Sequence, residues 1–163
     1  MTKIIISILS FLLIFFPFSG TLQSAYQNLT FPGQDVIISN VIDAVKSENI
    51  DAFEEMFSDD KKENHESLSA ELQNMSNQIE GEIISVDYVL GTHSESSKSG
   101  MGYVEKMCSW EFEIETTTNR YLLIVGWIIV DTLEPQNVGL SSLKLVDSEI
   151  ITSEGHKQLA LIN

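Results

Sequence analysis

Cysteine is almost absent from this chain, because Cys108 is the only one in 163 residues. One cysteine cannot form an internal disulfide, so the stability of the fold must come from a packed core. No cysteine stands directly after the apolar run near the amino terminus, which excludes lipid attachment at a bacterial lipoprotein site. Cys108 itself lies among apolar residues with no base beside it, a setting typical of a buried, unreactive thiol.

Positive charge is also scarce. The chain has 9 Lys and Arg residues against 24 Asp and Glu, a net charge of −15. Such a surface repels phosphates, so binding to nucleic acid or docking on an anionic membrane surface is disfavoured as a function. The acidic surplus by itself indicates only a well-solvated surface.

The common signatures of cofactor and metal sites are missing as well. The sequence has no glycine-rich phosphate loop, no nucleophile elbow and no zinc pattern. His65 and His156 have no partner at ligand spacing. We therefore predict no cofactor, no metal and no catalytic residue.

One long apolar run is present, from Ile4 to Phe16. Lys3 precedes it, and Pro17, Ser19 and Gly20 follow, which is the order of a secretory signal. The run is shorter than the roughly twenty residues that a spanning helix needs. We predict a signal peptide or an uncleaved amino-terminal anchor over 1–21, and hence an exported protein, extracellular or on the cell surface. In the second case the segment would be the chain's sole link to a membrane.

Helical patterns come first in the rest of the chain. After a short polar tether over 22–34, apolar residues recur at three- and four-residue spacing from Asp35. A second, short helix is expected from Asp51 as N-cap to Met56, and a third from about Lys62 to Glu80, with Gly81 as its stop.

Strand patterns then take over. We expect strands over 82–93, 103–116, 120–131 and 138–146, with a flexible hairpin loop over 94–102 and an amphiphilic tail over 148–163 that adds an edge segment or stays loose. The second strand alternates apolar and polar residues, whereas the third, Arg120 to Asp131, is apolar on both faces. The third strand should therefore be central and covered on both sides.

These elements predict one α+β domain over 35–147: three amino-terminal helices packed on one face of a curved four-stranded antiparallel sheet. The chain has no internal repeat and no linker long enough for a second domain.

The element order, Gly81-Glu82-Ile83-Ile84-Ser85, Trp127 through Glu134-Pro135, and the run from Val138 to Leu143 together support a resemblance. The chain resembles an uncharacterised family of small exported bacterial proteins, often lipoproteins, with a nuclear transport factor 2-like (cystatin-like) fold. The resemblance covers about 35–147. It implies a sheet curved around helices into a cone, with a pocket at the open end and pairing of sheets in dimers. It implies no catalytic residues, and this chain departs from the lipoprotein members because it lacks the lipidated cysteine.

Two polar groups could carry chemistry. Glu111, Glu113 and Glu115 alternate along one strand and could hold Ca²⁺, but carboxylates two residues apart splay about 7 Å, so a solvated face is favoured. Asp87 and His93 on the first strand could act as acid and base, although an exposed role is favoured for both.

Two functions remain open. The first is an exported, non-catalytic binding domain that pairs with an unknown protein partner or with itself through its sheet. Its interface candidates are the apolar residues of the third strand: Tyr121, Leu123, Val125 and Ile129. The second is a small-molecule pocket or a weak isomerase- or cyclase-like enzyme, with four candidate pocket residues: Tyr88, Asp87, Trp110 and Trp127.

Overall fold

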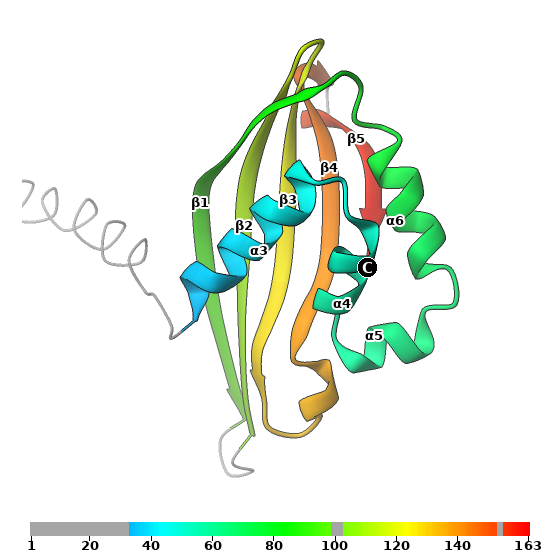
Figure 1. The fold of residues 1–163 in the computed structure, drawn as a ribbon. Coiled ribbons are helices and arrows are strands. Elements are labelled where there is room, and N and C mark those ends of the chain that lie inside the picture. The colour runs from blue at the N-terminus through cyan, green and yellow to red at the C-terminus, as the bar shows by residue number, and fades with distance from the viewer. Residues whose placement is uncertain (1–32, 99–102, 153–154) are drawn as a thin grey trace, which may run out of the picture. The chain divides into compact units, whose positions relative to one another are not determined.

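The described part of the chain has four α-helices followed by five strands, as a computed structural model shows (Figure 1). The structure describes residues 33–98, 103–152 and 155–163. All of them belong to one unit, residues 32–163. The predicted signal segment over 1–21 and nearly all of the predicted tether over 22–34 lie outside the described residues.

Helix α3 (Gln34–Lys46) forms where the apolar spacing predicts it. Its buried apolar side chains come from one stripe of the helix: Val41, Ala44 and Val45. Lys46 stands in the last turn, where a positive charge is favourable near the helix carboxyl end. The chain leaves the helix at Ser47, whose N–H donates to the carbonyl of Asp43 at 3.0 Å.

Helix α4 (Ile50–Met56) is capped by Asn49 rather than by Asp51, because the N–H of Ala52 donates to Asn49 Oδ1 at 3.1 Å. After this helix the Ser58 N–H donates to the Leu140 carbonyl at 3.1 Å, which ties α4 to the sheet. The approach is very close: a Cβ at Gly139 would lie 2.9 Å from the Ser58 nitrogen. Only glycine therefore fits position 139.

The prediction of three helices is wrong, because the segment expected as one helix over 62–80 is split. It forms α5 (Asp59–Asn64) and α6 (Leu68–Ser76), and His65 between them leaves helical geometry with φ −109° and ψ 81°. The physical reason lies in burial. Helix α5 has no buried residue, whereas α6 buries the apolar stripe of Leu68, Leu72 and Met75. Nothing apolar holds α5 in line with α6.

The prediction of four strands is also wrong. The sheet has five, β1 (Ile83–Lys98), β2 (Tyr103–Thr116), β3 (Arg120–Asp131), β4 (Gly139–Thr152) and β5 (Gly155–Ile162). All neighbours are antiparallel, in the order β1-β2-β3-β4-β5. The last predicted strand continues past Val146 as far as Thr152. The fifth strand, β5, then begins at Gly155, whose φ is 112°. Ile162 then pairs with Leu143 and is 1% exposed, so the carboxyl-terminal tail joins the core. The α+β class stands.

The core lies between the helices and one face of the sheet, which we call the inner face. Trp110, Phe112 and Ile114 on β2 are fully buried there. Burying one such side chain contributes about 1.5–3 kcal/mol. Figure 1 shows α3, α4, α5 and α6 on this same side of the sheet. The opposite face, which we call the outer face, therefore carries no described helix.

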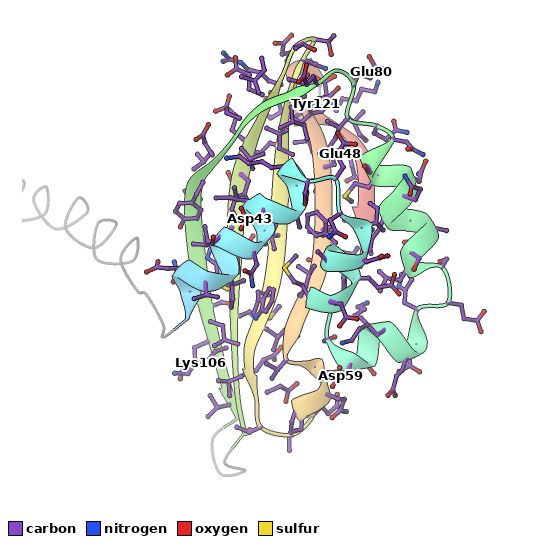
Figure 2. The ribbon with its side chains drawn as sticks, in the orientation of Figure 1. Asp43, Glu48, Asp59, Glu80, Lys106 and Tyr121 are labelled. Atoms are coloured by element: carbon purple, nitrogen blue, oxygen red, sulfur yellow. The ribbon has the colours of Figure 1, made fainter. Side chains whose placement is uncertain are left out.

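Two turns fasten the ends of the sheet. At one end the backbone of Glu80 is clamped, because its N–H donates to Tyr121 Oη at 2.9 Å and its carbonyl accepts from the Thr116 and Thr118 hydroxyls at 2.7 Å each (Figure 2). At the other end the Asp131 carboxylate accepts from the N–H of Glu134 at 2.9 Å. This bond, with others from Asn137 and Leu133, lowers the pKa of Asp131.

Candidate functional site

The outer face of the sheet has an ordered row of side chains across all five strands. The strand register places Leu90 beside Glu111, Glu111 beside Ile124, Ile124 beside Lys144, and Lys144 beside Leu161. We call these five residues the central row. Its order is apolar, acidic, apolar, basic, apolar, with β3 in the middle. The two ends are open to water, since Leu90 is 38% exposed and Leu161 is 44% exposed.

An apolar ridge runs along β3 through the centre of this face. Leu122, Ile124 and Ile128 form it, and all three are partly exposed. The ridge is interrupted at Gly126, which has no side chain. Its neighbours across the sheet are the small polar residues Ser109 and Ser142. Half-exposed aliphatic side chains on a face with no described cover are candidates for contact with another molecule.

Charge on the outer face is divided between the strands. On β2, Glu115 bonds to Arg120 at 3.1 Å and Glu113 lies 3.8 Å from the same guanidinium, so these two carboxylates are already paired. Glu111 and Lys144 have no ion-pair partner among the described residues. They stand on opposite sides of Ile124, with β3 between them. Two opposite charges in one row therefore remain available to a partner.

Three of the four predicted interface residues lie on the inner face. Tyr121, Leu123 and Val125 are 1%, 3% and 0% exposed, on the face that the described helices cover. Ile129 falls at an irregularity between the Lys106–Val130 and Met107–Ile128 pairs. The third strand is thus apolar on both faces as its sequence indicates, but its partly exposed side chains are the alternate residues, which begin with Leu122 and Ile124.

Three of the four predicted pocket residues lie together on the inner face, and one does not. The rings of Trp110 and Trp127 are 6.0 Å apart, and Tyr88 meets Phe112 edge to face at 5.9 Å. Asp87 pairs with Glu113 and belongs to the outer face. Trp110 is fully buried. The pKa of Tyr88 is raised, first by the partial burial of Tyr88 itself and then by the nearby Cys108. Tyr88 is 40% exposed, so this set of aromatic contacts extends from the buried core to the surface.

Cys108 stands beside these rings, 4% exposed, with its thiol 3.7 Å from the carbonyl oxygen of Trp127. Burial raises its pKa to about 12. The thiol is therefore protonated at neutral pH and is a poor nucleophile.

A Ser–Glu–His arrangement joins α5 to α6. The Glu71 carboxylate accepts from the Ser67 hydroxyl at 2.7 Å and lies 3.0 Å from His65 Nε2. The bond from Ser67 and then the bond from His65 lower the pKa of Glu71. The lowered pKa makes this carboxylate a weaker base, and its two bonds connect His65 and Ser67 to the first turn of α6.

No group of three or more His, Cys, Asp or Glu side chains in the described ranges is arranged to hold a metal ion. His65 lies on the helical side and His156 on the edge strand β5. Among the described helices, none has both the length and the apolar character that crossing a membrane requires.

The central row could not be found from the sequence alone. Its members are spread from residue 90 to residue 161, and a single slip in register would move each strand's set to the other face. The irregularity between Tyr88 and Leu90 changes which face of the sheet Leu90 joins. The available signals were the alternation of β2 and the double apolar character of β3.

The comparisons with known proteins give a family but no activity. A family model described as a domain of unknown function (DUF5104) matches residues 40–149, which is more than half of the chain. The matched range holds α4, α5, α6 and β1 to β3 whole, with most of α3 and β4. No curated protein matches the chain.

Proposed function

The chain belongs to the family defined by this domain of unknown function (DUF5104), and we propose that it is a non-catalytic domain that pairs with a second copy of itself through the outer face of the sheet. The central row carries this proposal. Its order of apolar, acidic, apolar, basic and apolar residues is complementary to its own reverse.

The symmetry of the pair follows from that order. A two-fold axis parallel to β3, midway between two facing sheets, exchanges β1 with β5 and β2 with β4. Glu111 of each copy then faces Lys144 of the other, Leu90 faces Leu161, and Ile124 packs on itself. Facing sheets lie about 10 Å apart, a gap that Glu and Lys side chains can bridge from the two sides.

The alternative symmetry is disfavoured by charge. A two-fold axis that runs along the central row, perpendicular to the strands, would keep β2 opposite β2 and β4 opposite β4, so that Glu111 would face Glu111 and Lys144 would face Lys144. Like charges placed opposite each other repel, and such pairs select against the wrong orientation. The central row therefore supports stacking about a two-fold axis parallel to β3 rather than about one perpendicular to the strands.

The size of the face supports a moderate affinity. Five strands about 4.8 Å apart and six residues of about 3.4 Å each cover ~490 Å² per copy, or ~1,000 Å² in total. This area is near the lower limit for a specific protein interface, about 1,000 Å². We expect a dimer that dissociates on dilution.

A charge exchange tests the pairing on the full chain. Light scattering should give twice the chain mass for the parent protein, and a lower average mass for Lys144→Glu and for Glu111→Lys, because each places like charges face to face. The double variant Glu111→Lys/Lys144→Glu should recover the dimer, since the exchanged charges again face each other. Lys157→Glu on β5 has the same change in charge away from the row and is the control.

A parent chain that is monomeric at every accessible concentration would refute the proposal. Dimerisation that survives both single substitutions would show that another surface pairs the copies.

Two further parts of the proposal concern compartment and superfamily. The apolar run behind Lys3 supports export of the domain. Helices followed by an antiparallel sheet support a nuclear transport factor 2-like fold. Fractionation of producing cells with amino-terminal sequencing would test export, which predicts protein outside the cytoplasm; a chain confined to the cytoplasm would contradict it.

A further inference from the structure

A cleft of about 400 Å³ opens on the helical side of the domain, away from the outer face. It lies between the carboxyl end of α3, α4, α6 and the inner face of the sheet. Its floor comes from the central strands: Ile114, Leu123, Leu143 and Leu145. The surface that the cleft exposes is mixed, with polar groups beside apolar side chains, and a cavity of this size is typical of small-molecule sites.

The cleft is closed below and open at its rim. Ile114, Leu143 and Leu145 are 0–1% exposed, so the free space lies above these side chains. Three isoleucines at the rim are partly exposed instead: Ile50 on α4, Ile79 after α6 and Ile83 at the start of β1. An apolar body would therefore bind against isoleucine side chains from three separate segments.

The charge of the lining is of one sign. Among the described residues that line it, Glu48 is the only charged one and none is Lys, Arg or His. Figure 2 shows Glu48 beyond the end of α3, on the side that faces α6. Gln73, Ser76 and Asn77 are further polar residues of the lining, and Gln73 Nε2 donates to Asn77 Oδ1 at 3.2 Å. An anionic head group would meet a carboxylate with no cation to offset it.

The position of this carboxylate is set by unusual backbone geometry. Glu48 has φ +50° and is the only non-glycine residue with positive φ among those described. It ends α3 in the left-handed conformation that usually selects glycine. The Asn49 N–H returns to the Ala44 carbonyl at 3.0 Å and fixes this turn beside the cleft.

We propose that this cleft binds a small apolar molecule with a cationic amine head, the apolar body lying against the isoleucine rim and the head near Glu48. The site is independent of the pairing proposed above, because the two lie on opposite faces of the sheet. The chemistry names a class of ligand: an alkyl- or arylamine whose body is no larger than the cleft.

Three eight-carbon probes with different heads test the charge preference. Calorimetric titration of the full chain should show one saturable site for octylamine, weaker binding of octanol and the weakest binding of octanoate. Glu48→Gln should lower the octylamine affinity about 3- to 10-fold, towards that of octanol, because the loss of a partly exposed charge contact costs on the order of 1 kcal/mol. The same substitution should leave octanol binding unchanged.

A second pair of variants tests the location. Gln73→Trp places a large ring at the rim and should reduce octylamine binding at least 10-fold. Asn74→Trp, on the neighbouring exposed position of α6 that does not line the cleft, should leave binding unchanged. The dimer-breaking Lys144→Glu should also bind octylamine normally, which separates this proposal from the pairing proposal.

Absence of a saturable octylamine site in the parent chain would overturn the inference. Equal binding of octylamine and octanoate, or unchanged binding to Gln73→Trp, would overturn it too, because each result places the probe somewhere other than this acidic rim.

Discussion

Glu48 shows how one residue links backbone geometry to a binding surface. Its left-handed conformation costs an L-residue about 1–2 kcal/mol relative to glycine. The Glu48 carboxylate is also the sole charge in the lining of the cleft. A residue that is unfavourable for the fold therefore stands where the proposed ligand head would bind. Replacing Glu48 by glycine should therefore increase the stability of the fold and weaken binding of the proposed ligand.

The first prediction follows from this conflict. Glu48→Gly should raise the free energy of unfolding by about 1 kcal/mol, because glycine adopts positive φ without a steric penalty. Urea denaturation measures the change. Glu48→Gln keeps the side-chain bulk at the same φ and should leave stability unchanged, so equal stabilities of the Gly and Gln variants would contradict the stated cause.

At the scale of elements, the junction of α5 and α6 depends on one carboxylate. Glu71 accepts from Ser67 and lies beside His65, and these bonds connect the end of α5 to the first turn of α6. Lys61 on α5 adds a weaker attraction. The apolar stripe of α6 begins directly at Leu68, so this junction also sets where the helix packs.

The second prediction concerns pH. The folded-state pKa of Glu71 lies below the usual value of about 4.3 for an unfolded chain. Stability from this group is thus fully present above about pH 4.3 and is lost as the pH falls through the lower folded pKa. Thermal unfolding between pH 5 and pH 3 should show a smaller loss for Glu71→Gln than for the parent.

Glu66→Gln provides the matched control, because Glu66 is exposed nearby and has no hydrogen bond or ion pair in the described contacts. A parent and a Glu71→Gln variant with parallel pH curves would rule out the junction as the source of the acid sensitivity.

At the scale of the whole molecule, the sheet separates two kinds of surface. The inner face holds the aromatic core and the cleft, and the outer face holds the central row. The described helices cover the inner face, so partly exposed aliphatic side chains remain on the outer face with no described element over them. Pairing of two copies removes that surface from water without any new element.

The third prediction uses mass action. If two copies pair in the folded state alone, the melting temperature of the parent chain should rise with protein concentration. A tenfold dilution should lower it measurably, while the melting temperature of Lys144→Glu should stay constant over the same range. Differential scanning calorimetry at two concentrations makes the comparison. A parent melting temperature that is independent of concentration would contradict self-pairing.

The sequence by itself determined the class of fold and most of its elements. Spacing of apolar residues placed α3 and α4, and alternation placed β2 and its own buried side chains such as Trp110 and Phe112. These patterns depend on neighbours a few residues apart, which a sequence displays directly. The composition also excluded an internal disulfide and a basic surface.

Only the tertiary structure decided the split of α5 from α6, the fifth strand and both candidate sites. The split depends on whether α5 finds a surface to bury, and β5 depends on Gly155 returning the tail to Leu143. The central row depends on register across five strands, and the irregularities near Leu90 and Trp127 shift that register. Contacts between residues so far apart along the chain follow from how the strands align, and no local pattern contains that alignment.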